Sequence, residues 1–160
     1  PNTKSILDMG AGAGFPGLAL AIGLIETDND TDSDDAVSDD AAKITLVESN
    51  GKKCNFLRTV IRELSLPAKV VNGRIENLPP QSYDVITARA FAPLPKLLGY
   101  SLPFFGKDSL ALFPKGANWK EEVSTAQQTY DFDLNTTPSQ TDEVAQILHI
   151  TNLRIKNING

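Results

Sequence analysis

Hydrophobic residues along the chain form short runs that alternate with longer stretches of helical periodicity. Such runs, several of them rich in β-branched residues, predict buried strands. They cover residues 5–9, 43–48, 68–71, 83–88 and 109–113. The stretches between them predict helices at 16–26, 51–64 and 92–105, the last interrupted by prolines. Alternation of this kind indicates an α/β fold with a mostly parallel sheet and helices on both faces.

The pattern weakens after residue 113. Residues 119–129 predict a further helix, and residues 130–134 and 145–155 predict extended segments that fit a closing antiparallel pair. The count of predicted strands is therefore seven. With 160 residues, 41% of them hydrophobic, the chain has the size of one globular domain, and we expect a single domain over residues 1–160.

The predicted helix at 51–64 is amphipathic. Its apolar stripe consists of Cys54, Leu57, Val60, Ile61 and Leu64. A basic side lies largely off that stripe and consists of Lys52, Lys53, Arg58 and Arg62. These four cations form either a solvated helix face, which is common in proteins, or a groove for RNA.

Acidic residues are concentrated in one segment. Residues 26–40 hold eight carboxylates and no Lys or Arg, and the rest of the chain carries 15 basic and 12 acidic groups, a net charge of +3. We expect residues 27–40 to be a disordered acidic insertion, because they bury too little apolar surface to offset the entropy of ordering. A calcium loop is the weaker interpretation, because position six of the repeat is Ser33 rather than glycine.

Bulk features exclude several classes of protein. The sequence shows neither a membrane span nor a signal peptide, so we expect a cytoplasmic protein that does not bind a membrane. Cys54 and His149 are the single cysteine and the single histidine, which are too few soft ligands for a zinc site. We therefore predict no metal.

A glycine-rich turn follows the first predicted strand. Gly10, Gly12 and Gly14 permit a tight turn and the close approach of a ligand, while the next helix offers free N–H groups. Residues 12–17 also satisfy the dinucleotide pattern G-x-G-x-x-G, which alone is weak evidence. Asp8, two residues before the first glycine, is placed to order this turn around a cationic ligand, or is simply a capping carboxylate.

Further candidate residues follow the second and third predicted strands. Glu48 ends the second strand, where its two oxygens can accept hydrogen bonds from the hydroxyl groups of a ribose. It would otherwise be a solvated strand end. Residues 73–76, Gly-Arg-Ile-Glu, follow the third strand and are placed to contact an adenine ring.

Several segments together resemble one methyltransferase family, RsmG, also called GidB or glucose-inhibited division protein B. The similarity runs from about Ser5 to Gly116. Gly-Phe-Pro-Gly at 14–17 and Ala-Arg-Ala-Phe-Ala-Pro-Leu at 88–94 are its most specific parts. The resemblance implies a Rossmann-like class I S-adenosylmethionine-dependent methyltransferase that methylates N7 of a guanine in 16S ribosomal RNA of the small ribosomal subunit. We expect the protein to act as a monomer.

The resemblance also implies roles for individual residues. It places Gly10, Gly12 and Phe15 in the cofactor turn, Glu48 at the ribose, and Ile75 and Glu76 near the adenine. Together with Asp8, argued above from its position, and Arg89, these are the residues that we expect to bind S-adenosylmethionine. Arg89 is further expected beside the reacting centre, as the catalytic residue and an RNA contact, and Lys115 is expected to contact an RNA phosphate. The family usually has Asp where Glu48 stands, and an N-terminal helical region that leads us to expect an N-terminal truncation here.

Chemistry supports this assignment without a general base. Guanine N7 has an in-plane lone pair outside Watson–Crick pairing, so positioning supplies most of the acceleration. Arg89 has the donors to hydrogen-bond guanine O6 or the cofactor carboxylate, although a surface salt bridge is its simpler role. The alternatives are an NAD-dependent oxidoreductase, a small-molecule methyltransferase, and a non-catalytic RNA-binding or assembly module of the same fold.

Overall fold

The computed structural model describes residues 5–28 and 43–157. The chain divides into two compact units, Pro1–Leu78 and Pro79–Gly160, which are described separately below. The single domain expected over 1–160 therefore stays a prediction. Of the expected acidic insertion, residues 29–40 lie outside the described residues. Within the described residues, no helix is both long and apolar enough to cross a membrane.

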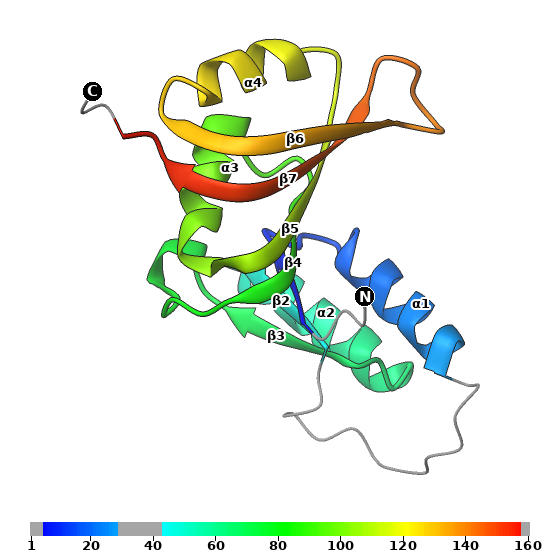
Figure 1. Cartoon of the computed structure of the whole chain (residues 1–160). Helices are drawn as coiled ribbons and strands as arrows, with labels where there is room; N and C mark the ends of the chain where they lie inside the picture. Colours follow the sequence, from blue (N-terminus) through cyan, green and yellow to red (C-terminus); the bar gives the residue numbers. More distant parts are fainter. Residues whose placement is uncertain (1–4, 29–42, 158–160) are drawn as a thin grey trace. The chain divides into compact units, whose positions relative to one another are not determined.

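The first unit is a three-stranded parallel sheet with connecting helices (Figure 1). Its strand order is β3-β2-β1. In chain order its elements are β1 (Ile6–Met9), α1 (Gly17–Asp28), β2 (Ile44–Glu48), α2 (Gly51–Glu63), β3 (Ala68–Asn72) and the short 3₁₀ helix η2 (Ile75–Asn77). Because all three strands are parallel, their carboxyl ends lie along one edge of the sheet, where turns that bind ligands are typically found.

Burial in the first unit agrees with the prediction for β1 and β2, but β3, predicted as a buried strand, has only Ala68 buried because it is the edge strand of the order β3-β2-β1. All residues of β1 and β2 are buried, as expected for strands covered on both faces. On α2, Cys54 and Leu57 are fully buried. Leu64, predicted to continue the apolar stripe, is 52% exposed. This part of the prediction is wrong because Leu64 is the C-cap of α2, and the chain turns away at Ser65, which has a φ of 49°.

The second unit combines parallel and antiparallel pairing. Its strand order is β4-β5-β7-β6, with β4 parallel to β5 and the pairs β5–β7 and β7–β6 antiparallel. Its elements are β4 (Tyr83–Thr87), α3 (Leu94–Ser101), the 3₁₀ helix η3 (Leu102–Phe104), β5 (Phe105–Lys115), α4 (Trp119–Ala126), β6 (Tyr130–Pro138) and β7 (Gln146–Ile155). The expected closing antiparallel pair is confirmed, and the α/β class with mostly parallel pairing is confirmed over the two units.

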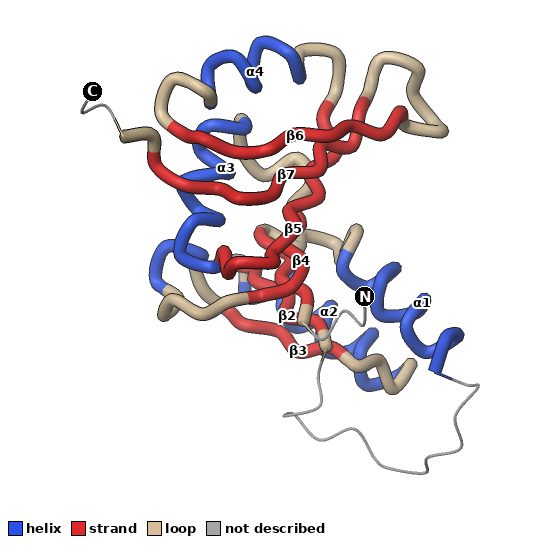
Figure 2. The backbone as a smooth tube through the Cα atoms, viewed as in Figure 1, coloured by secondary structure: helices blue, strands red, loops and turns tan. Residues whose placement is uncertain are grey.

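Several boundaries in the second unit differ from the prediction, and β6 for example runs to Pro138 where the predicted segment ends at 134. The helix expected at 92–105 is α3 followed by η3 (Figure 2). α3 begins only after its N-cap Pro93, and Pro103 in η3 lacks the backbone N–H that a continuous helix would use. β5 begins at Phe105, four residues before the predicted start. The Ser109 hydroxyl bonds the Tyr83 carbonyl at 2.5 Å and the Gly106 amide at 2.7 Å, which ties this irregular early part of β5 to β4.

Candidate functional site

The glycine-rich turn after β1 has the backbone conformation that its sequence predicts. Gly10, Gly12 and Gly14 have φ values of 69°, 57° and 96°, in a region that residues with a Cβ rarely adopt. The turn is closed by a hydrogen bond of 2.7 Å from the Gly14 amide to the Ala11 carbonyl. The Ala11 amide donates to the Val47 carbonyl at 3.0 Å, which fastens the turn to β2.

Two glycines of this segment are required by packing as well. A Cβ on Gly14 would overlap the side chain of Leu18, and one on Gly17 would overlap Leu46 and lie 2.6 Å from Asp8 Oδ2. Gly12 is different, because a Cβ there would meet only the Gly10 carbonyl oxygen, at 3.7 Å. There is therefore room for a further atom beside the Gly12 backbone.

Glu48, at the carboxyl end of β2, is held in place by two backbone amides. Its Oε2 accepts from the Gly12 amide at 2.9 Å, and its Oε1 accepts from the Asn50 amide at 2.7 Å. Only 8% of the residue is exposed. Each carboxylate oxygen has a second lone pair, so both remain able to accept a hydroxyl hydrogen. The carboxylate predicted for a ribose is therefore fixed against the glycine turn.

Asp8 lies beneath the turn and is completely buried. Its Oδ2 accepts from the Gly17 amide at 3.0 Å, at the first residue of α1. Its Oδ1 has no hydrogen-bond partner among the described residues. Burial raises the pKa of Asp8 to about 7, and the Gly17 bond opposes this rise only in part. The capping role considered for Asp8 is confirmed for Oδ2, and Oδ1 remains a buried acceptor without a hydrogen-bond donor among the described residues.

The remaining predicted cofactor residues of this unit lie at the ends of its strands. Ile75, in η2, is buried at 3% exposure, and Glu76 beside it is exposed. The Gly73 amide donates to the Glu48 carbonyl at 3.0 Å, which ties the segment after β3 to the end of β2. Phe15 is 55% exposed. The structure thus brings the glycine turn and Glu48 into contact and places Ile75 close along the chain from Gly73.

Asn50 and Gly17 were not among the predicted site residues, although both hold one in place. Asn50 is the N-cap of α2, and its Oδ1 accepts from the amides of Lys52 and Lys53. An Asn immediately before a helical pattern is a recognisable capping signal in the sequence. The backbone contact to Glu48 has no such signal.

Arg89 follows β4 in the second unit, on the loop between Thr87 and Leu94. It is exposed, whereas Ala88 before it is buried at 1% exposure. Ala90 after it has a φ of 50°. Arg89 is thus displayed on a loop with an unusual backbone, and its expected role at the reacting centre stays a prediction.

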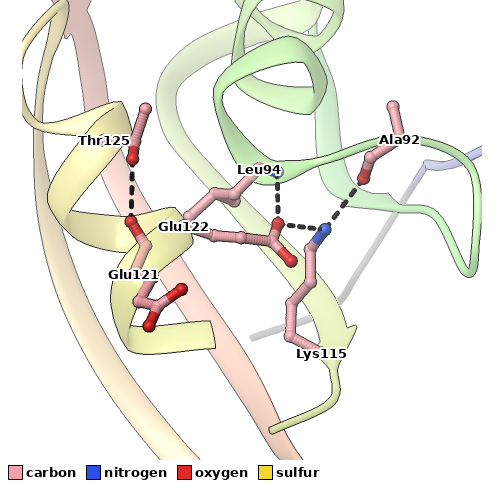
Figure 3. Close-up of polar contacts among 6 residues, drawn as sticks. All are labelled: Ala92, Leu94, Lys115, Glu121, Glu122 and Thr125. Atoms are coloured by element: carbon pink, nitrogen blue, oxygen red, sulfur yellow. Dashed lines mark hydrogen bonds and ion pairs between the residues drawn. The ribbon is translucent and has the colours of Figure 1, made fainter. Parts of the chain in front are cut away.

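Lys115 is engaged inside the second unit. Its Nζ donates to the Ala92 carbonyl at 2.8 Å and to Glu122 Oε2 at 2.7 Å, and its side chain is 10% exposed (Figure 3). Glu122, on α4, was not predicted as a functional residue, and no periodicity relates it to Lys115, because Lys115 lies on a strand and Glu122 on a helix. The RNA phosphate contact expected of Lys115 stays a prediction.

Metal ligands are not gathered in the described ranges. No group of three or more His, Cys, Asp or Glu side chains that could hold an ion occurs among residues 5–28 and 43–157. What the first unit provides is a set of fixed hydrogen-bond acceptors, the carboxylates of Glu48 and Asp8, beside the glycine turn.

Solved structures with a similar fold include S-adenosylmethionine-dependent methyltransferases. A TehB-like S-adenosylmethionine-dependent methyltransferase from Corynebacterium glutamicum matches with a TM-score of 0.63 and 14% identity, covering 94% of this chain and 81% of that protein. Aeropyrum pernix fibrillarin, crystallised with natively bound S-adenosylmethionine, matches with a TM-score of 0.63 and 14% identity, covering 93% and 66%. The fold is that of a class I S-adenosylmethionine-dependent methyltransferase.

Sequence comparison gives the family. Residues 1–151 match the GidB family, rRNA small subunit methyltransferase G. The ribosomal RNA small subunit methyltransferase G of Hyphomonas neptunium is 40% identical over 157 residues, covering 98% of this chain and 69% of that protein. The protein of the same name from Cereibacter sphaeroides is 42% identical over 144 residues, covering 90% and 65%. The chain belongs to this family and spans about two thirds of the length of these relatives.

Family membership decides among the alternatives left open by the glycine turn. The pattern G-x-G-x-x-G is shared with dinucleotide enzymes, but neither the family nor the similar structures support an NAD-dependent oxidoreductase. The family equally gives no support to a non-catalytic module or a small-molecule methyltransferase. The resemblance drawn from Gly-Phe-Pro-Gly and the segment at 88–94 is confirmed.

Proposed function

We propose that this protein transfers a methyl group from S-adenosylmethionine to N7 of a guanine in 16S ribosomal RNA, with the small ribosomal subunit as its partner. The single observation that carries the proposal is the Glu48 carboxylate, fixed by the Gly12 and Asn50 amides beside an open glycine turn. The family name of the curated relatives supports the choice of substrate. The protein then works as a cytoplasmic monomer, with residues 1–160 acting as one methyltransferase domain.

The cofactor is proposed to lie against the first unit. Glu48 accepts hydrogen bonds from the two ribose hydroxyls, and Ile75 and Glu76 contact the adenine. Gly10 and Gly12 let the ligand approach the backbone, and Phe15 borders the same turn. The unpartnered Asp8 Oδ1 is buried, so we assign it to an ordered water that links Asp8 to the turn on which the ligand rests. These hydrogen-bond acceptors and the glycine backbone beside them therefore fit S-adenosylmethionine.

Bound S-adenosylmethionine supplies an electrophilic methyl group on a positively charged sulfur. The protein does not need to remove a proton, because the lone pair of guanine N7 is already free. Arg89 is proposed to donate hydrogen bonds to guanine O6, which lies beside N7 on the same edge of the base. Arg89 thereby selects guanine over adenine, which carries an amino group at that position.

The test uses purified protein, S-adenosylmethionine labelled in the methyl group, and 30S subunits that lack the modification. We expect label to be incorporated into 16S RNA, and digestion to release labelled 7-methylguanosine. Subunits that already carry the modification are the matched control and should take up no label at that position. Label on another nucleotide, or no label on any RNA, would overturn the proposal.

A further inference from the structure

A partly buried ion pair joins the end of β5 to the first turn of α4. Lys115 Nζ lies 2.7 Å from Glu122 Oε2, and the two side chains are 10% and 27% exposed (Figure 3). Ion pairs removed from water to this degree require well-placed hydrogen bonds to compensate for lost hydration. The other groups that hydrogen-bond to Lys115 and Glu122 therefore indicate the structural role of the ion pair.

Both partners bind the backbone of the loop that carries Arg89. Lys115 Nζ donates to the Ala92 carbonyl at 2.8 Å, and the same Glu122 Oε2 accepts from the Leu94 amide at 2.6 Å. Leu94 is the first residue of α3. The N-cap of this helix is Pro93, whose side chain makes no capping hydrogen bond. Glu122 thus supplies from another helix the capping acceptor that the local sequence lacks.

The loop held in this way contains a strained residue. Ala90 has a φ of 50°, a left-handed conformation that costs an alanine about 1 kcal/mol or more. Strained backbone of this kind persists only where the surroundings fix it. Ala88 is buried on one side of Ala90, and Ala92 and Leu94 are bound by the ion pair on the other. Arg89 lies directly beside the strained residue.

We propose that Lys115 and Glu122 are positioning residues that hold the 88–94 loop in the conformation in which Arg89 meets the target guanine. This inference rests on the proposed function and deepens it by adding Glu122 and by giving Lys115 a role other than phosphate contact. The Lys115 charge is already neutralised by Glu122, so its contribution to RNA attraction is small. Its geometry instead sets the backbone on which the predicted catalytic residue is displayed.

The central variant is Glu122→Gln, because glutamine keeps an oxygen for the Leu94 amide but removes the charge that holds Lys115. The matched control is Glu121→Gln, an equal change of charge one residue earlier on α4, where the Glu121 side chain is exposed. Lys115→Met is paired with Lys120→Met, an exposed lysine on the same helix as Glu122. Lys115→Arg tests rescue by a different cation.

Three measurements separate positioning from general damage. We expect Glu122→Gln and Lys115→Met to lower kcat about 10- to 100-fold, as misplacement of a reacting group typically does. The KM for 30S subunits and the affinity for S-adenosylhomocysteine should change less than about threefold, because the predicted cofactor residues of the first unit are untouched. Hydrogen exchange of the Leu94 amide should accelerate in Glu122→Gln and not in Glu121→Gln. Lys115→Arg should recover part of kcat.

Two results would overturn the positioning role. One is a kcat for Glu122→Gln equal to that of Glu121→Gln. The other is a Lys115→Met variant that loses RNA affinity while keeping kcat, which would make Lys115 a phosphate contact. Wild-type protein that methylates no 30S subunit would refute the proposed function and the positioning role together, so the two failures are distinguishable.

Discussion

The carboxylate of Glu48 accepts a hydrogen bond of 2.9 Å from the amide of Gly12, 36 residues earlier in the chain. Through this contact, the glycine turn after β1 fixes the orientation of the acidic side chain at the end of the neighbouring strand β2. The orientation is thus present in the protein before any ligand binds, and binding does not have to bear the cost of ordering it.

Replacing Glu48 by Gln should weaken cofactor binding strongly. Hydrogen bonds to a charged acceptor contribute about 1.5–3 kcal/mol each, so we expect the Kd of S-adenosylhomocysteine to rise about 10- to 100-fold by calorimetry. The amide group of Gln also presents donors to the Gly12 or Asn50 N–H group. Glu63→Gln, an exposed carboxylate on α2, is the control and should bind as the wild type does. Equal affinity of the two variants would contradict the proposed ribose contact.

Stability should fall as pH rises through the range in which Asp8 ionises. Its pKa is about 7 in the folded protein against 3.8 for an ordinary aspartate, so the folded state binds more protons between these values. The stabilisation is complete below about pH 4 and is lost as pH approaches and passes 7, a change on the order of 4 kcal/mol for this group. Urea unfolding at pH 5 and pH 8 measures the part of this change that falls between pH 5 and pH 7, about 2–3 kcal/mol.

Asp8→Asn isolates this effect, because the asparagine oxygen still accepts from the Gly17 amide while the ionisation is removed. The variant should lose most of the difference in unfolding free energy between pH 5 and pH 8. Asp108→Asn, at an exposed aspartate, should keep it. A variant at Asp8 with the full wild-type pH dependence would show that another group is responsible.

Alanine at Gly14 and at Gly12 should affect different properties. Gly14→Ala combines a φ of 96° with overlap of Leu18, and we expect it to lower the unfolding free energy by about 2–4 kcal/mol. Gly12→Ala has room for its Cβ and should cost only about 1–2 kcal/mol. It should nevertheless weaken S-adenosylhomocysteine binding more than tenfold, on the order of the 1.4 kcal/mol that this factor represents. The reverse ranking would place the ligand elsewhere.

The thiol of Cys54 should be inert in the folded protein. It is fully buried and donates to the Glu48 carbonyl at 3.1 Å, and burial raises the pKa of Cys54 above its ordinary value. The thiolate is the reactive form, so alkylation by iodoacetamide at pH 8 should proceed only as fast as the protein opens. Mass spectrometry after timed labelling, with and without urea, measures this. Rapid labelling without urea would mean that α2 detaches readily from β2.

Much of this arrangement follows from local sequence patterns. The glycine turn, the strand that ends at Glu48 and the helix that begins at Gly51 are specified by residues close together in the chain, and the structure agrees with them. The positions of Asp8 and Glu48 at one edge of a sheet follow because parallel strands share the direction of their ends. Pattern and topology together were sufficient for these features.

Contacts between distant segments were not predictable in the same way. The sequence marks Lys115 as a cation near the end of a strand, but the Ala92 carbonyl and Glu122 that surround it come from other elements. From sequence alone, a charged residue is predicted to be exposed and able to bind a ligand, because its partners within the fold are not known. Leu64 was misplaced for a related reason, because periodicity does not indicate at which turn a helix leaves its sheet.

The left-handed conformation of Ala90 limits which residues evolution or selection can place there. In a library of all amino acids at position 90, function should be retained mainly by Ala, Gly, Asn and Asp, because the latter three adopt this conformation most readily. β-Branched residues should be eliminated, however small they are. The set of residues tolerated at this position is therefore determined by the backbone conformation and depends little on the size of the side chain.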